Sequence, residues 1–180
     1  MNILFYCPFK FNLNSKNIRS LGGIETLNVD LSKELIKRKF NIHLATFCKS
    51  KIIKNGVINI PIDIIKRNNH DYNFDVIISS NDSKIFDFYK NSKKILWMHN
   101  TLSLEKAFRK KKIFSILKNK ITAVFVSKYL NKKTSKLYSF NNREVIPNFL
   151  SPFFYPKEIN YKRKKIFVWS VQRKKGLSNV

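Results

Sequence analysis

Short apolar runs typical of β-strands alternate with longer, helix-like segments along most of this 180-residue chain. Such a chain folds as a parallel sheet, because each helix returns the chain to the same edge of the sheet before the next strand begins. We therefore expect an α/β fold: a Rossmann-like parallel sheet with helices on both faces. Strands are expected at residues 2–6, 41–46, 57–60, 75–80, 94–99, 123–127 and 144–146.

The first expected helix follows the first strand. Ile24, Leu27, Leu31 and Leu35 recur at three- and four-residue spacing, with charged residues between them, so one face of this helix is apolar. Further helices are expected at residues 82–89, 103–118 and 128–138, and an irregular basic stretch at residues 47–56.

Two adjacent glycines, Gly22 and Gly23, stand at the start of the first helix. Without a Cβ, they let an anionic group approach backbone N–H donors, and the helix dipole favours negative charge at this end. We expect a diphosphate to bind here. The alternative is a tight turn in which strand and helix pack closely.

Several charged residues lie near these glycines in the sequence. Lys10, Lys16 and Arg19 belong to the long connection of residues 7–21, and connections of this length are usually functional or mobile. They either meet the charge of a substrate or form solvated surface. Glu25, in the first turn of the helix, serves the helix dipole or contacts substrate.

Polar residues also follow two of the later strands. His99 and Asn100 come at the end of one apolar strand, and Ser127 and Lys128 at the end of another. The carboxyl ends of parallel strands are where open α/β sheets bind ligands, so we expect substrate contacts here. The alternatives are a rim histidine for His99 and a helix N-cap for Ser127.

The chain carries 36 lysines and arginines against 11 aspartates and glutamates, a formal net charge of +25. Such a surplus is typical of proteins that meet nucleic acid, anionic lipid or phosphorylated substrates. It is equally expected of a protein encoded by an AT-rich genome, in which lysine fills solvated positions. The surplus is clustered at residues 109–112, 118–120, 132–133 and 162–165, which favours a basic surface that faces phosphates.

Other classes of protein lack support in the sequence. Cys7 and Cys48 are the only cysteines, without CxxC spacing or a Cys/His cluster, so we expect no disulfide framework and no metal. The GxGxxG pattern of dinucleotide-dependent oxidoreductases is missing. So are the RNP-like, helix-turn-helix and zinc-finger patterns of nucleic-acid-binding proteins.

No apolar run approaches the ~18 residues of a membrane-spanning helix, and the N-terminus is too short and uncharged for a secretory signal. We expect a cytoplasmic protein. Residues 108–120 combine Ile113, Phe114, Ile116 and Leu117 with clustered basic side chains. This segment either makes a peripheral contact with the inner face of an anionic membrane or forms a core helix with a solvated lysine-rich face.

A change of character near the end of the chain indicates a domain boundary. Pro147, Pro152 and Pro156 break helices there, and a new strand-like run follows at residues 166–171. One strand and a turn cannot form a domain, so the chain is expected to end where a second α/β unit begins.

Taken in order, several segments resemble the GT-B glycosyltransferases, in particular the large family 4 (group 1). The matching segments are Gly22-Gly23-Ile24-Glu25, residues 31–46, Trp97-Met98-His99-Asn100, residues 124–130, Val145-Ile146-Pro147-Asn148, and residues 167–170 with Lys175-Gly176-Leu177. Two departures stand out. Lys39 replaces a glycine that is usual in the family, and Phe149-Leu150-Ser151 replaces Gly-Val-Asp.

The resemblance implies an enzyme that transfers a hexosyl-type sugar from a nucleotide-diphosphate donor with retention, without a metal or other cofactor. It implies a role in cell-surface glycan or glycolipid synthesis, such as lipopolysaccharide or polysaccharide, with a glycan or lipid-linked acceptor. The catalytic assignment falls on His99, as a hydrogen-bond donor to the donor sugar. Gly22, Gly23, Arg173 and Lys175 are assigned to the donor diphosphate.

The resemblance also divides the chain. Residues 1–160 correspond to the N-terminal, acceptor-side domain, and residues 161–180 to the first strand and turn of an incomplete nucleotide-sugar-binding domain. The Glu-x7-Glu motif of that second domain is not in the chain, so we expect these 180 residues to be inactive by themselves. The alternative function is a non-catalytic basic α/β module that binds nucleic acid or another polyanion.

Overall fold

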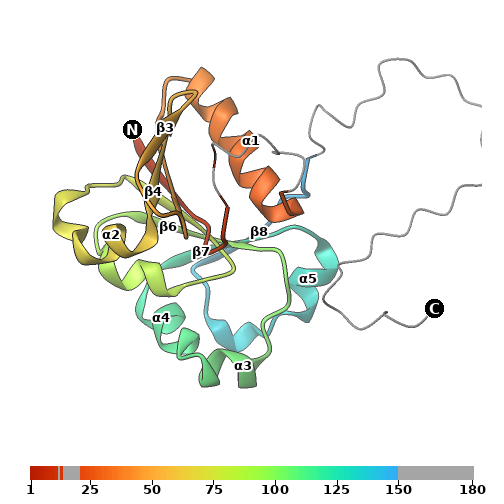
Figure 1. Ribbon diagram of the computed structural model, residues 1–180. Helices are drawn as coiled ribbons and strands as arrows, with labels where there is room; N and C mark the ends of the chain where they lie inside the picture. The colour runs from red at the N-terminus through yellow and green to blue at the C-terminus, as the bar shows by residue number, and fades with distance from the viewer. Residues whose placement is uncertain (12, 14–20, 150–180) are drawn as a thin grey trace, which may run out of the picture.

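The computed structural model describes residues 1–11, 13 and 21–149 (Figure 1). These residues form an eight-stranded sheet in the order β3-β4-β2-β1-β5-β6-β7-β8. Every neighbouring pair is parallel except β3 with β4. The expected Rossmann-like α/β fold is confirmed. Residues 161–180, assigned to a second domain, lie outside the described residues.

The strands are β1 (Asn2–Tyr6), β2 (Asn41–Thr46), β3 (Ile52–Lys54), β4 (Val57–Pro61), β5 (Val76–Ser80), β6 (Lys93–Met98), β7 (Ile121–Phe125) and β8 (Asn142–Val145). The α-helices are α1 (Gly23–Lys37), α2 (Ile62–Arg67), α3 (Leu104–Arg109), α4 (Lys112–Lys118) and α5 (Lys128–Lys133). The 3₁₀ helices within the described residues are η2 (Asn69–Asp71), η3 (Lys84–Phe88) and η4 (Lys136–Tyr138). Each strand expected before residue 149 is present, within two residues of its expected start, whereas the run at residues 166–171 lies outside the described residues.

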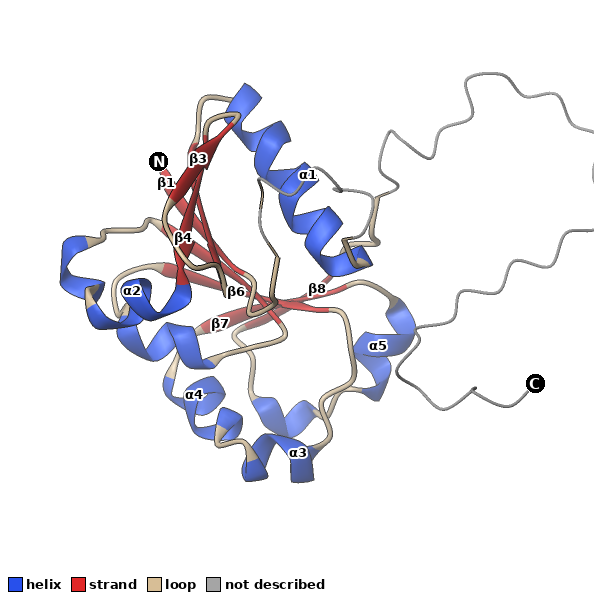
Figure 2. Cartoon of the chain, viewed as in Figure 1, coloured by secondary structure: helices blue, strands red, loops and turns tan. Residues whose placement is uncertain are grey.

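Helices cover both faces of the sheet (Figure 2). On one face α1 packs against a core that includes Phe5 and Leu44. The helices that follow the later strands cover the opposite face, where the core includes Leu4 and Phe125. Of the apolar residues expected to face the sheet from α1, Leu27 is buried, whereas Leu31 and Leu35 are half-buried at the edge of the core.

Two elements were not expected from the sequence. Residues 47–56 were expected to be irregular, but β3 pairs there with β4 as an antiparallel hairpin. Asn55 and Gly56 both have positive φ at its turn, 51° and 78°, which is the backbone that an Asn-Gly hairpin turn requires. The second element is α2, which follows β4 directly after Pro61 because proline is well suited to precede a helix.

The expected helix at residues 128–138 is interrupted. It comprises α5 and then η4, with Thr134 in an extended conformation between them. The carbonyl oxygens of Asn131 and Thr134, which would otherwise continue the helix, accept hydrogen bonds from Arg143. Pairing with a side chain from β8 therefore ends α5 early.

The order of the strands fixes where a ligand can bind. From β1 the chain moves outward through β2 to β4, and it then returns to β5 on the other side of β1. The connections from β1 and from β5 therefore diverge at the carboxyl edge of the sheet, which leaves a crevice between them. In the described part of the chain, no helix combines the length and apolar character needed to cross a membrane.

Candidate functional site

A cavity of about 270 Å³ lies at this divergence, where β1, β5 and β6 end. Pro8 and Phe9 approach it from β1, and Asn100 and Thr101 from β6. The other lining residues are Ser80, Asn81, Asp82, Met98, Leu102, Lys106, Lys110 and Lys112. Open α/β sheets bind ligands at this position, so this cavity is the candidate site.

Asn81 holds the wall of the cavity together. It has a left-handed backbone, with φ of 58°. Its side-chain Oδ1 accepts hydrogen bonds from the backbone N–H groups of His99, at 2.8 Å, and Asn100, at 3.2 Å. The N–H of Asn81 donates to the carbonyl of Trp97 at 3.0 Å. The ends of β5 and β6 are thus joined through one residue.

A cationic wall comes from the turn between α3 and α4. The Nζ of Lys112 donates to the carbonyl of Asn81 at 2.7 Å and lies 3.4 Å from Oδ1 of Asp82. Burial lowers the pKa of Lys112, and Asp82 opposes this shift. Lys106 and Lys110 also line the cavity and are exposed. Asp82 is the single acidic residue against three lysines, so the cavity suits an anionic group.

His99 follows β6 and is partly covered. Its ring lies 4.6 Å from the ring of Trp97, measured between centroids. Its Nε2 is buried and has no hydrogen-bond partner among the described residues. Burial lowers the pKa of His99 to about 4. The imidazole is therefore neutral at pH 7 and can donate or accept a hydrogen bond without carrying charge.

We predict that this histidine makes the protein less stable in mild acid. Because the pKa of His99 in the folded protein is about 4 and its ordinary value is 6.5, the unfolded chain binds the proton more tightly between these pH values. Stability is therefore lost as the pH falls from 6.5 to 4, by about 2 kcal/mol after allowance for partial solvent screening. Urea unfolding at several pH values measures this loss.

The His99→Gln variant provides the control for this prediction. It is expected to keep only the acid-induced loss that comes from other groups, such as His43, whose pKa burial also lowers. A wild-type curve and a His99→Gln curve with the same slope between pH 6.5 and 4 would contradict the assignment of this loss to His99.

The start of α1 is open to solvent. Gly22 and Gly23 are both exposed, and the backbone of Gly22 is extended, with φ of −67°, which any residue can adopt. A Cβ added to Gly23 would meet no described atom within 4 Å. Among the described residues, neither backbone strain nor packing therefore explains the second glycine. Gly23 is therefore open to the approach of a ligand.

Glu25 lies against the first of these glycines. A Cβ at Gly22 would be 2.5 Å from Oε2 of Glu25, so this carboxylate folds back over the helix start. Glu25 also contributes, after burial itself, to the raised pKa of the Cys7 thiol at the end of β1. A carboxylate in the first turn complements the helix dipole, and an anionic ligand at Gly22 would have to displace it.

A buried polar contact ties α1 to the sheet near this end. The Nδ2 of Asn28 donates to the hydroxyl of Ser80 at 3.0 Å, and both residues are fully buried. Ser80 ends β5 and also lines the cavity. The contact therefore sets the position of α1 relative to the candidate site.

Several residues expected at the site do not line the cavity, among them Gly22, Gly23, Glu25 and His99. Asn100 lines the cavity, whereas Lys10 is exposed and does not. Ser127 caps α5, because its hydroxyl accepts from the N–H of Leu130 at 3.1 Å. Lys128 lines a separate cavity of about 460 Å³ beside α5. Four expected residues lie outside the described part of the chain: Lys16, Arg19, Arg173 and Lys175.

The sequence interpretation missed Asn81, Asp82 and Lys112. Asn81 and Asp82 directly follow a buried strand, so the strand-end argument applied to His99 would have found them. Lys112 gave no such signal, because it lies within a basic run and only the fold brings it to the cavity.

Within the described ranges, no group of three or more histidine, cysteine or acidic side chains could hold a metal ion. No protein-family model and no curated protein matches the chain.

Proposed function

We propose that this chain is the N-terminal, acceptor-side half of a GT-B glycosyltransferase that uses a nucleotide-diphosphate sugar. The observation that carries the proposal is the cationic cavity at the strand divergence, together with the open, two-glycine start of α1, a helix that Asn28 ties to the cavity residue Ser80. Three lysines line the cavity, and the first turn of α1 has N–H groups that the N-cap residue Gly22 does not cap; both features are suited to a diphosphate. The order of the matching sequence segments supports the sugar-transfer class over other users of diphosphates.

In this proposal His99 contacts the transferred sugar as a neutral hydrogen-bonding group. Asn81 positions it, since the Oδ1 of Asn81 holds the backbone N–H of His99 at 2.8 Å. Catalysis of sugar transfer needs pre-organised groups on both sides of the sugar. The described domain would supply one side, so we expect binding without turnover from these 180 residues.

Calorimetric titration with a panel of nucleotide-diphosphate sugars tests the proposal. The double variant Lys106→Gln/Lys110→Gln removes two exposed cations from the cavity wall and should weaken binding about tenfold. The matched control is Lys49→Gln/Arg67→Gln, which removes the same charge from exposed positions elsewhere. Equal weakening in both double variants, or no binding of any nucleotide sugar, would contradict the proposal.

The alternative, a basic module for nucleic acid, is separated in the same experiment. Tight binding of RNA or DNA with a steep dependence on salt, together with no response to nucleotide sugars, would favour it. A glycosyltransferase half is expected to bind nucleic acid only weakly and without saturation at a single site.

We also propose that the α3–α4 turn meets an anionic membrane, where a lipid-linked acceptor would be found. Phe108, Phe114 and Leu117 are 56%, 62% and 55% exposed, and the rings of the two phenylalanines contact each other. Arg109 at the end of α3, and Lys110 and Lys111 in the turn that follows, lie between the two phenylalanines in the chain and are exposed. Ile113 and Ile116 are buried in the core instead.

We predict that the protein sediments with phosphatidylglycerol vesicles and only weakly with phosphatidylcholine vesicles. Phe108→Ser/Phe114→Ser should reduce the bound fraction at least about tenfold, because each phenylalanine loses its burial in the bilayer. The control is Leu137→Ser, at a residue that is 68% exposed on η4. If the phenylalanine variant and the control bind vesicles alike, the proposed contact is wrong.

A further inference from the structure

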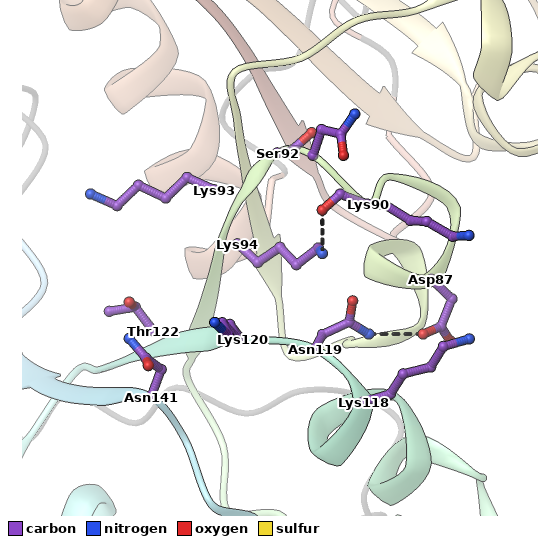
Figure 3. Close-up of a pocket in the computed structure, with 11 residues that line it drawn as sticks. Asp87, Lys90, Ser92, Lys93, Lys94, Lys118, Asn119, Lys120, Thr122 and Asn141 are labelled. Carbon is purple, nitrogen blue, oxygen red and sulfur yellow. Dashed lines mark hydrogen bonds between the residues drawn. The ribbon is translucent and has the colours of Figure 1, made fainter.

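A third cavity lies at the opposite, amino edge of the sheet (Figure 3). Its volume is about 650 Å³, and it is bounded by the start of β6, the start of β7 and the end of α4. Nothing in the proposed sugar transfer uses it, because the candidate site lies where the strands end.

Lysine dominates the lining of this cavity. The charged lining residues are Lys90, Lys93, Lys94, Lys118, Lys120 and Asp87. Asp87 is engaged by Asn119, whose Nδ2 donates to its carboxylate at 2.9 Å. Among the described residues, none of the five lysines forms an ion pair. Asp87 can balance only one of the five lysine charges, so the cavity keeps a surplus of positive charge.

Lys94 is the most informative of the five, because it is only 8% exposed. It stands in β6 between Ile77 of β5 and Ile121 of β7. Its Nζ donates to the carbonyl of Lys90 at 3.1 Å, which leaves further N–H groups for another acceptor. Figure 3 shows this Nζ among the lining residues, between Lys90 and Asn119. Burying an ammonium without a counterion costs free energy.

Ordinary surface explanations account for the other lysines but not for this one. Lys118 lies in the last turn of α4, where the helix dipole favours a cation. Lys90, Lys93 and Lys120 are exposed and can be solvated. A lysine that only covers apolar surface extends its ammonium into water, whereas the ammonium of Lys94 turns to a protein carbonyl.

We propose that this amino-edge cavity is a binding site for a phosphate or diphosphate group, with Lys94 at its base and the exposed lysines at its rim. The volume falls within the ~300–1,000 Å³ typical of sites for small molecules. Compact, multiply charged oxyanions match several convergent ammonium groups. The group belongs either to a soluble phosphorylated compound or to the headgroup of an anionic lipid.

The first test follows backbone amide signals of ¹⁵N-labelled protein during titration with inorganic pyrophosphate. Saturable shifts are expected at Lys94, Asn119 and Lys120, and Lys94→Met should weaken them about tenfold or more. The control Lys49→Met removes an exposed lysine far from the cavity lining and should leave the affinity within about twofold. Each backbone amide gives its own signal, so binding at the strand-end cavity shifts a different set of signals and can be told apart.

A second variant tests the proposal independently, in case Lys94→Met does not fold. Lys118→Met/Lys120→Met alters two exposed rim residues and should also weaken the pyrophosphate shifts at Lys94. If Lys49→Met weakens binding as much as Lys94→Met, or the shifts do not saturate, the lysines attract anions diffusely and the proposal is overturned.

Binding to lipid vesicles, in competition with pyrophosphate, distinguishes the two sources of the phosphate. Phosphatidic acid vesicles that bind in a Lys94-dependent manner, and that pyrophosphate does not displace, indicate a lipid headgroup. Displacement by pyrophosphate indicates a soluble ligand. RNA binding that survives Lys94→Met, with no pyrophosphate shifts at the amino-edge cavity, would overturn the proposal in favour of a nucleic-acid surface.

Discussion

Replacing Asn81 with alanine is expected to lower the free energy of unfolding by about 3 kcal/mol. The change leaves the N–H groups of His99 and Asn100 without the acceptor that they share, the Oδ1 of Asn81. It also places alanine in a left-handed backbone conformation, at φ of 58°. Urea unfolding measures the loss, and the same variant should weaken binding of nucleotide-diphosphate sugars because the end of β6 is released.

Two further variants separate the causes of this effect. Asn55 has a similar backbone, with φ of 51°, but it lies exposed in the β3–β4 turn. Asn55→Ala therefore measures the backbone penalty alone, about 1 kcal/mol. Asn81→Asp keeps an acceptor oxygen and tolerates the left-handed conformation, so it should recover most of the stability. Equal losses in Asn81→Ala and Asn55→Ala would show that the two hydrogen bonds contribute nothing.

Arg143→Met is expected to destabilise the protein by about 3 kcal/mol. The guanidinium of Arg143 donates to the carbonyls of Asn131, at 3.0 Å, and Thr134, at 2.8 Å. It also lies over the rings of Phe125 and Phe140, 5.0 and 5.6 Å from their centroids. Methionine keeps apolar contact with these rings but leaves the carbonyls at the end of α5 without their donor.

The control for this prediction is Arg67→Met, because Arg67 is exposed on α2. It should change the free energy of unfolding by no more than about 0.5 kcal/mol. Arg143→Lys should recover only part of the loss, since an ammonium lacks the planar fork that reaches several carbonyls at once. Recovery of full stability by Arg143→Lys would contradict a cap that depends on guanidinium geometry.

The central strands were predictable because strands that are buried on both faces are rich in apolar residues. Val76, Ile77 and Ile78 form the apolar part of the expected strand, which lies in the middle of the sheet as β5. The helix after Gly23 was predictable for the matching reason, a regular apolar spacing. The residues on its buried face were harder to predict. Asn28 and Ser32 are buried and form hydrogen bonds, and a search for apolar spacing does not find such polar residues.

The elements at the edge of the sheet were harder to predict. The strand β3 has three residues and no alternation strong enough to mark it, although the Asn55-Gly56 pair did carry a hairpin signal. Isoleucines recur both in β4 and, after Pro61, in α2. Composition therefore does not mark where the strand ends and the helix begins.

The candidate site was only half predictable. Asn100 follows from its place at a strand end, whereas the roles of Gly22, Gly23 and His99 stay predictions, because none of the three lines the cavity. The cationic wall could not be predicted from the sequence, because Lys112 reaches Asn81 only after α3 and α4 fold back over the end of β5. Ser127 fits the alternative that the sequence offered, because its hydroxyl caps α5.

The most direct test of the account is a titration of ¹⁵N-labelled protein with nucleotide-diphosphate sugars, observed at each backbone amide. We predict saturable shifts at Gly23, Ile24, Asn100 and Thr101 for at least one sugar nucleotide, with smaller shifts for the matching nucleoside monophosphate. The account would be contradicted if none of these amides responded to any nucleotide sugar, or if the response were confined to the lysine cavity at the amino edge.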